Sequence, residues 1–301
     1  MDASRGCNAM NSGKPLFLAA GHRGVRATSA DGETWTKAEV GKEGEVLRAA
    51  ACGGGVCLAV GTFGGSNLFA VTTDGAVWQV ERKDAQYRYF LRGLCYGRDQ
   101  FLGLGGDPGS VGSSSPFVLT SRDGRAWSEL KPISGKEILR RAAWGNDRYV
   151  AVGDRGRRAT SPDGFEWKDA PRVKALDTLV DLAFGNGVFV GVGLHGLRMS
   201  TRDGVAWSSP VRGEEGEHLN TVLWTGTEFV AIGMGGTWFS PDGESWRREP
   251  NCNAPLTASY GDGRFVGAAW KGRLLFSKNA VDWREVDRLP HHVEAVAFGE
   301  I

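Results

Sequence analysis

The sequence lacks long apolar runs and an excess of charge of either sign. No stretch of 18 or more apolar residues occurs in the 301-residue chain, and its first residues lack the apolar segment of a secretory signal. Lysine and arginine number 36 against 35 aspartates and glutamates, a formal net charge of +1. We therefore expect no transmembrane segment and no general attraction to nucleic acid or anionic membranes, so any charged site must be local.

Spacings typical of metal sites are also missing. The five cysteines and five histidines form no Cys-x-x-Cys or His-x-x-x-His pair, and no Asp-x-Asp-x-Asp-Gly loop suited to calcium is present. The glycine-rich stretch from Gly105 to Gly109 lacks the Lys-Ser/Thr of a phosphate-binding loop. We predict no metal and no cofactor.

Glycine and tryptophan, in contrast, are abundant and recur in a repeat. The pattern Ser/Thr-x-Asp-Gly-x-x-Trp occurs six times, at Asp31, Asp74, Asp123, Asp163, Asp203 and Asp242. A seventh copy has Asn279 and Ala280 in place of Asp and Gly. The seven tryptophans, from Trp35 to Trp283, lie 43, 49, 40, 40, 39 and 37 residues apart. This spacing is the length of a four-stranded propeller blade.

The residues between the boxes supply the other strands. A small, apolar segment such as Leu139–Gly145 suits a crowded innermost strand, and Arg148–Gly153 suits the second strand. The chain opens near Pro15 without an innermost strand and carries one at residues 293–298 with no box after it. We predict an all-β, seven-bladed β-propeller with four antiparallel strands per blade over residues 14–301, after a tail of residues 1–13. The C-terminal strand completes the first blade and closes the ring.

The boxes resemble those of the Asp-box, or bacterial neuraminidase repeat, family. Its propellers include sialidases, sortilin-type receptors, some lectins and the photosystem II assembly factor of plants and cyanobacteria. The resemblance covers nearly the whole chain and implies the fold rather than one activity. All six complete boxes read Asp-Gly directly, whereas the sialidase form usually has a residue between the two. The likeness is therefore to non-enzymatic members such as the assembly factor and the sortilin-type propellers.

Each box is expected to act as a structural staple. At the turn between the third and fourth strands, Asp can accept backbone N–H bonds and Gly tolerates positive φ. The Trp can pack between neighbouring blades. The six aspartates are thus predicted to be structural.

Two cysteines stand where other repeats have facing aromatic rings. The last position of the innermost strand and the start of the second are aromatic in five repeats: Tyr96 and Phe101, Trp144 and Tyr149, Phe184 and Phe189, Trp224 and Phe229, Tyr260 and Phe265. In the second repeat they are Cys52 and Cys57, so we predict a disulfide across this hairpin. Cys7 and Cys252 are a candidate second bridge, with Cys95 as an inert core thiol. Disulfides would favour an extracytoplasmic protein, secreted, periplasmic or surface-attached after loss of a leader. The alternative is five reduced thiols in the cytoplasm.

Arginines start three successive innermost strands. In register these positions are Arg48, Arg92 and Arg140, with Arg141 and Asp181 one position later and Glu294 beside Arg48 across the closure. Three guanidiniums at one channel mouth could clamp a carboxylate, sulfate or phosphate. The alternative is ordinary channel lining, in which Arg48 pairs with Glu294 and the others with Asp181 or water.

The loops between second and third strands lie on the same face as these arginines. They contribute a mixture of aromatic and polar tips suited to a peptide or a sugar ring: His22, Arg23, Phe63, Asp107, Asp154, Arg155, His195, Met234, Trp270 and Lys271. The tips differ between blades, which predicts one asymmetric site.

We predict a non-enzymatic binding or assembly module that holds a protein or peptide partner on this loop face, where an exposed apolar or aromatic patch is expected. One alternative is a lectin-like carbohydrate-binding protein using Trp270 and Phe63. Another is a sialidase-like glycoside hydrolase with an arginine anion site. A hydrolase of that kind needs an activated tyrosine, and Tyr87 and Tyr89 have no matching glutamate. We therefore assign no catalytic residue.

Overall fold

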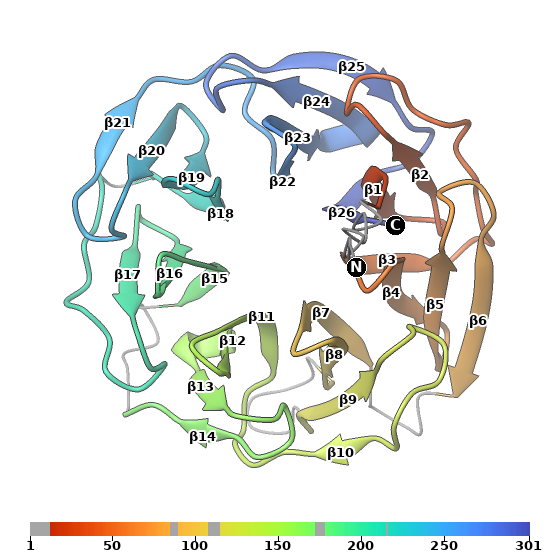
Figure 1. Cartoon of the computed structure of the whole chain (residues 1–301), viewed down its shortest axis with the longest axis horizontal. Coiled ribbons are helices and arrows are strands. Elements are labelled where there is room, and N and C mark those ends of the chain that lie inside the picture. Colours follow the sequence, from red (N-terminus) through yellow and green to blue (C-terminus); the bar gives the residue numbers. More distant parts are fainter. Residues whose placement is uncertain (1–12, 85–89, 108–114, 172–177, 215) are drawn as a thin grey trace, which may run out of the picture.

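The computed structural model is a ring of seven small antiparallel sheets, which confirms the predicted seven-bladed propeller (Figure 1). It describes residues 13–84, 90–107, 115–171, 178–214 and 216–301. Each sheet is one blade, and its strands are given from the innermost outward. Blade 1 is β26 (Val293–Glu300), β1 (Pro15–Gly21) and β2 (Arg26–Ser29). Blade 2 is β3 (Val46–Gly53), β4 (Val56–Phe63), β5 (Ser66–Thr72) and β6 (Gln79–Asp84).

The next blades follow the same order around the ring. Blade 3 is β7 (Leu91–Gly97), β8 (Gln100–Gly105), β9 (Phe117–Ser121) and β10 (Lys131–Pro132). Blade 4 is β11 (Leu139–Gly145), β12 (Arg148–Gly153), β13 (Arg158–Ser161) and β14 (Lys168–Asp169), with the 3₁₀ turn η1 (Asp154–Gly156) after β12. Blade 5 is β15 (Leu179–Gly185), β16 (Val188–Gly193) and β17 (Arg198–Thr201).

Two blades complete the ring. Blade 6 is β18 (Leu219–Trp224), β19 (Phe229–Gly233), β20 (Gly236–Ser240) and β21 (Arg247–Glu249). Blade 7 is β22 (Thr257–Gly261), β23 (Arg264–Ala269), β24 (Arg273–Ser277) and β25 (Arg284–Arg288), with η3 (Trp270–Gly272) after β23. Among the described residues, no helix is long and apolar enough to cross a membrane.

The outermost strand is weaker than predicted in two blades. Blades 1 and 5 contain three strands, and the fourth position is reduced to single bridges, Arg26 with Glu39 and Arg198 with Val211. In blade 5 the residue before Val211 is Pro210, which has no N–H to extend a ladder. The prediction of four strands therefore holds for the other five blades.

The ring closes between the two ends of the chain. β26 pairs with β1 from Glu300 opposite Pro15 to Ala295 opposite Ala20, and so supplies the innermost strand of blade 1. Phe17 and Phe298 face each other across this pair, with ring centroids 4.8 Å apart. The predicted closure by the C-terminal strand is confirmed.

Six innermost strands carry a bulge at one equivalent position. The extra residue in each is Arg48, Arg92, Arg140, Val180, Asn220 or Glu294. Opposite each bulge, the second strand contains a glycine, which is its last residue in every one of these blades except blade 2: Gly61, Gly105, Gly153, Gly193, Gly233 and Gly21. A Cβ atom there would lie 1.8 to 2.3 Å from a carbonyl oxygen just before the bulge. Blade 7 has Ala269 at this position, and the β22–β23 register is regular. The glycine thus permits the close approach that forms the bulge.

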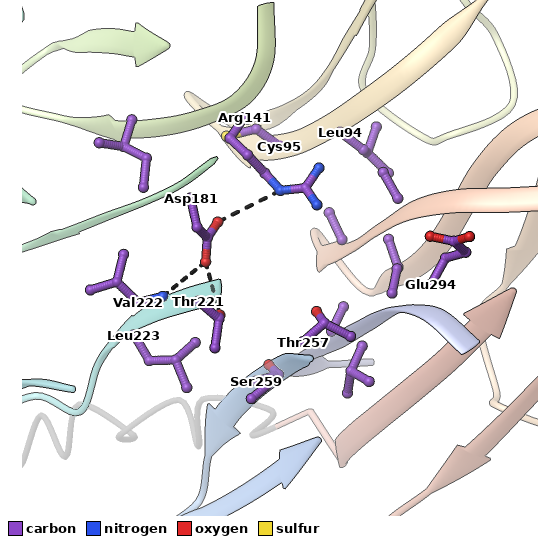
Figure 2. Close-up of a pocket in the computed structure, with 18 of the residues that line it drawn as sticks. Leu94, Cys95, Arg141, Asp181, Thr221, Val222, Leu223, Thr257, Ser259 and Glu294 are labelled. Carbon is purple, nitrogen blue, oxygen red and sulfur yellow. Dashed lines mark hydrogen bonds and ion pairs between the residues drawn. The ribbon is translucent and has the colours of Figure 1, made fainter. Parts of the chain in front are cut away.

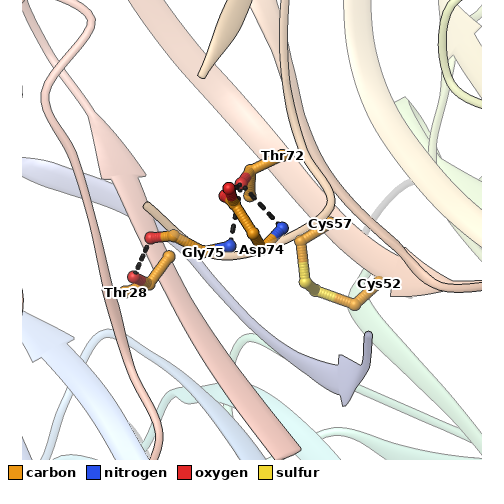
Figure 3. Close-up of a disulfide and its surroundings, with 6 residues drawn as sticks. All are labelled: Thr28, Cys52, Cys57, Thr72, Asp74 and Gly75. Atoms are coloured by element: carbon orange, nitrogen blue, oxygen red, sulfur yellow. Dashed lines mark hydrogen bonds between the residues drawn. A yellow bond between two sulfur atoms is a disulfide. The ribbon is translucent and has the colours of Figure 1, made fainter. Parts of the chain in front are cut away.

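The aromatic pairs and the disulfide lie at the opposite end of the innermost strands. The five predicted pairs have ring centroids 4.6 to 5.0 Å apart. Cys52 and Cys57 occupy the equivalent pair in blade 2 and form the predicted disulfide (Figure 3). Their Cα atoms are 4.1 Å apart, the close spacing of a non-hydrogen-bonded pair.

The other cysteines have different surroundings. Cys95 is buried and unpaired, as predicted, and burial raises the pKa of its thiol to about 12. Cys252 is exposed and forms no disulfide with a described cysteine. Its proposed partner, Cys7, lies outside the described residues, so the second bridge stays a prediction.

The boxes form hydrogen-bonded turns on the face opposite the bulges. Asp31 Oδ1 accepts bonds from the backbone N–H groups of Thr34 at 2.7 Å and Glu33 at 2.8 Å, and from the Ser29 hydroxyl. These bonds, the Thr34 N–H above all, lower the pKa of Asp31 to about 2. Asn279 accepts the same two backbone bonds in the seventh box, at 2.9 and 3.0 Å.

The boxes also join neighbouring blades. The Thr28 hydroxyl of blade 1 donates to the Gly75 carbonyl in the box of blade 2 (Figure 3), and Thr237 donates to Ala280 in the same way. The Trp127 ring lies 5.1 Å from the Phe69 ring of the preceding blade. These contacts support the predicted role of the boxes as staples.

We expect Gly61→Ala to destabilise the propeller. The added Cβ would lie 1.8 Å from the Val46 carbonyl oxygen, and relieving such overpacking costs about 2 kcal/mol of unfolding free energy. Urea titration followed by tryptophan fluorescence measures the loss. Gly65→Ala in the same blade is the matched control, because nothing lies within 4 Å of its Cβ position. Equal stability of the two variants would contradict the role of the bulge glycine.

Deletion of residues 292–301 removes β26 and reopens the ring. Because blade 1 would lose its innermost strand and its pairing with β1, we expect the cooperative thermal transition to be lost from the whole propeller. Circular dichroism and tryptophan fluorescence would report it, with Glu300→Ala, an exposed position at the strand end, as the control. A deleted chain that melts at the wild-type temperature would disprove closure as the source of cooperativity.

Asp242→Asn should remove a pH-dependent part of the stability. Backbone bonds, first from Ser245, lower the pKa of Asp242 from 3.8 to about 2. A carboxylate whose pKa is lowered by folding stabilises the native state above its unfolded pKa, and this contribution disappears as the pH falls through about 2. Urea midpoints should therefore favour the wild type at pH 6, with the gap closing on acidification. A gap that does not change with pH would count against this origin.

Candidate functional site

A cavity of about 820 Å³ runs through the centre of the ring and is lined by residues of all seven innermost strands. We call it the channel. Antiparallel order places the bulges, the ends of the second strands and the starts of the third strands at one end, which we call the mouth. Leu194 and Trp270 line the channel from the loops at this end, and Arg48 lines it from its bulge. The mouth therefore brings together residues from separate blades, as the sequence predicts.

Three arginines gather on one side of the mouth. Burial, together with the positive charges of Arg48 and Arg140, lowers the pKa of the Arg92 guanidinium to about 10. The Nε atoms of Arg48 and Arg92 are buried and have no hydrogen-bond partner among the described residues. Arg140 instead makes two bonds to the Asp154 carboxylate, one of them 2.9 Å from Nη2 to Oδ2. The predicted cluster is therefore present, but one member is neutralised.

The expected pairing of Arg48 with Glu294 is wrong. Glu294 lies 2.6 Å from His22 Nε2, because His22 follows Gly21, directly opposite the bulge that carries Glu294. Arg48 stands on the neighbouring blade and forms no ion pair with a described carboxylate. Asp181, the other expected partner of the arginines, pairs with Arg141, whose Nε lies 3.6 Å from Asp181 Oδ1.

Blades 5 to 7 present apolar side chains at the mouth. The residue directly after the second strand is Leu194 in blade 5, Met234 in blade 6 and Trp270 in blade 7, with exposed fractions of 43%, 73% and 65%. In blades 1 to 4 the same position holds His22, Thr62, Gly106 and Asp154. The mouth is thus divided into a cationic half, Arg48, Arg92 and Arg140, and an apolar half, Leu194, Met234 and Trp270.

Trp270 is held in place by the closure. Its ring stacks on His292 with centroids 5.0 Å apart and an angle of 15°, and His22 lies edge-on to His292 at 5.3 Å. Residue 271 in the same turn adopts a left-handed φ of 61°. The exposed indole is therefore fixed in orientation rather than free to fold back.

Other predicted loop residues do not line the channel. Arg155 lies 3.8 Å from Glu137, and the His195 N–H donates to His218 Nδ1 at 3.2 Å. Phe63 lies beneath the Arg82 guanidinium at 5.6 Å. Arg23, His195 and Lys271 adopt left-handed turn positions, with φ between 54° and 61°. Tyr87 and Tyr89 lie outside the described residues.

Leu194 is the residue that sequence reasoning missed. It is the third member of the apolar half, and its signal was present: it follows the terminal glycine of the second strand, as Met234 does.

Asp181 and Arg141 line the channel, each one residue further along its strand than the bulge residue (Figure 2). Asp181 Oδ2 accepts bonds from the Thr221 hydroxyl at 2.8 Å and the Val222 N–H at 2.9 Å. Burial raises the pKa of Asp181, while the Arg141 charge and these bonds oppose the rise. The pair is therefore a fixed polar element of the wall.

Comparison with known proteins identifies the class but not a particular protein. No protein-family model matches the chain, and no curated protein matches it. Among solved structures, "YCF48 bound to D1 peptide" has 18% identity and a TM-score of 0.57, covering 79% of this chain and 80% of that chain. YCF48 from Cyanidioschyzon merolae has 17% identity and a TM-score of 0.59, covering 83% and 87%.

A third solved structure is more similar in shape and lower in identity. A functionally unknown protein from Desulfotomaculum acetoxidans DSM 771 has 9% identity and a TM-score of 0.69, covering 95% of this chain and 99% of that chain. At such identities the likeness concerns the fold. The chain is thus a seven-bladed β-propeller with a divided channel mouth.

Proposed function

We propose that the protein is a non-enzymatic binding or assembly module that holds a protein or peptide partner at the channel mouth. The observation that carries the proposal is the division of the mouth into an apolar half and a cationic half on opposite blades. Leu194, Met234 and Trp270 expose apolar surface on three successive blades, and contiguous patches rimmed by polar groups are typical of interaction sites.

The cationic half supports a partner that carries a negative charge. Burial first, and then the positive charges of Arg48 and Arg140, lower the pKa of Arg92, and an anion among these guanidiniums would relieve their repulsion. A carboxylate satisfies guanidinium donors in a paired geometry. The expected partner segment therefore presents an acidic group beside apolar side chains, which peptides supply readily.

The surroundings of the tyrosines favour binding over hydrolysis. Tyr96, Tyr149 and Tyr260, the three described tyrosines, each face a second ring in the core pairs. Burial raises the pKa of Tyr149 to about 12, which is unfavourable for a nucleophile. A propeller with the same fold is known bound to a peptide, namely YCF48 with the D1 peptide. This supports the capacity of the fold for such a partner.

An extracytoplasmic location is part of the proposal. The Cys52–Cys57 bridge occupies the position that an aromatic pair holds in other blades. Structural disulfides persist in oxidising compartments. Their presence favours a secreted, periplasmic or surface-attached protein over a cytoplasmic one.

Selection from a displayed random-peptide library tests the partner class. We expect enriched peptides that combine Asp, Glu or a free carboxylate with apolar residues. Their affinity, measured by fluorescence polarisation, should fall at least about tenfold in the triple variant Leu194→Ser, Met234→Ser, Trp270→Ser, because central aromatic anchors dominate such interfaces. Arg48→Ala with Arg92→Ala should weaken binding and reduce its salt dependence.

Val77→Ser and Arg125→Ala are the matched controls. Val77 is 66% exposed and Arg125 is half-buried, and both belong to the boxes on the opposite face. They should leave peptide affinity unchanged. The proposal fails if no peptide is enriched, or if the mouth variants bind as the controls do.

A further inference from the structure

The channel wall contains polar groups that can form further hydrogen bonds beyond those they make within the protein. Asp181 Oδ2 accepts two bonds, and Oδ1 forms a long ion pair with Arg141, 3.6 Å from its Nε. A carboxylate oxygen has two lone pairs, so Oδ1 can accept a further bond. Arg141 donates from Nη1 to the Arg140 carbonyl at 3.2 Å, and its outer guanidinium atoms point into the channel (Figure 2). One acceptor and one set of donors therefore face the same space.

Two hydroxyls on the next wall complete this group. Thr257 and Ser259 lie on β22, line the channel and form no side-chain hydrogen bond with any described residue. Figure 2 shows them on the same side of the cavity as Thr221 and Asp181. Each hydroxyl can both donate and accept. The polar wall, defined as Arg141, Asp181, Thr257 and Ser259, spans blades 4 to 7.

The facing wall is mostly apolar and contains small side chains, with Arg48 and Glu294 as its charged members. Blades 1 to 3 contribute Ala50, Leu94, Cys95, Ala295 and Ala297 to the lining. Small side chains leave room at the centre, and the volume of about 820 Å³ lies within the size range of small-molecule sites. A ligand in the channel would thus meet hydrogen-bonding groups on one side and mostly apolar surface on the other.

We propose that the channel binds a neutral polyhydroxylated small molecule, a sugar or polyol, at the polar wall. Asp181 Oδ1 accepts from a ligand hydroxyl, Arg141 donates to a neighbouring one, and Thr257 and Ser259 satisfy others. The C–H face of the ligand packs on the alanines opposite. This site is separate from the mouth and does not rest on the proposed peptide-binding function.

The charges of the polar wall favour a neutral ligand. Arg141 and Asp181 carry opposite charges side by side, so their fields largely cancel within the channel. An anion would meet Asp181 and a cation would meet Arg141, each at close range. Paired donors and acceptors without net charge match hydroxyl groups, which both donate and accept.

Saturation-transfer NMR and calorimetry with D-mannose, N-acetyl-D-glucosamine, trehalose and myo-inositol test the site on the full chain. We expect millimolar or tighter binding of at least one probe. The double variant Thr257→Val, Ser259→Ala should weaken it about tenfold, equivalent to about 1.4 kcal/mol. Because neither hydroxyl bonds to the described protein, this variant should fold normally, which its melting temperature checks.

Further variants locate the site. Asp181→Asn should also lose binding, whereas Ser209→Ala, an exposed hydroxyl near the outer edge of blade 5, and Arg48→Ala at the mouth should retain it. Binding that survives the Thr257→Val, Ser259→Ala variant, or no binding of any probe, would overturn the inference. Peptide affinity at the mouth is measured separately, so failure of the sugar site leaves the proposed function standing.

Discussion

The close approach of the innermost strand to a glycine at or near the end of the second strand is the constraint on which the mouth depends. At Gly61 and its equivalents no Cβ fits, because a carbonyl oxygen occupies the space. The bulge that follows turns one residue per blade toward the mouth, and in blades 2 to 4 that residue is arginine. The same backbone bulge occurs in six blades and places the charged groups at the mouth. What differs is the side chain that each bulge carries.

The contacts that stabilise the fold and the side chains proposed to bind a partner lie at opposite ends of the same strands. At one end, box turns, aromatic pairs and the Cys52–Cys57 bridge repeat almost without change, and the hydroxyls of Thr28 and Thr237 join blade to blade. At the other end the side chains after the shared glycine differ from blade to blade. Because the repeated end fixes the frame, the mouth and the channel wall can vary without disturbing the packing. The two proposed ligands use this freedom at different places, a peptide at the mouth and a polyhydroxylated molecule at Asp181 and Arg141.

Much of this arrangement could be predicted because it repeats. The spacing of the boxes indicated the number of blades, and the innermost strand at residues 293–298 with no box after it indicated the closure. The presence of Cys52 and Cys57 where other repeats have two facing rings indicated the disulfide. Register placed Arg48, Arg92 and Arg140 on one face. The sequence did not reveal which side chains pair between different elements. Glu294 contacts His22, and Arg140 donates to Asp154. Both pairs join a bulge residue to the residue after the glycine opposite it in the same blade. Because the sequence pattern does not show the bulge, it could not reveal these pairings.

The sequence by itself determined the fold, since a local motif repeated seven times needs no distant information to specify a blade. It also determined which residue types reach the mouth, because strand alternation and register are local properties. Only the tertiary structure decided which charges cancel and which remain available. That decision depends on distances of a few ångströms between side chains from separate blades, such as Arg141 and Asp181. The apolar half likewise became a surface only when blades 5, 6 and 7 were set side by side.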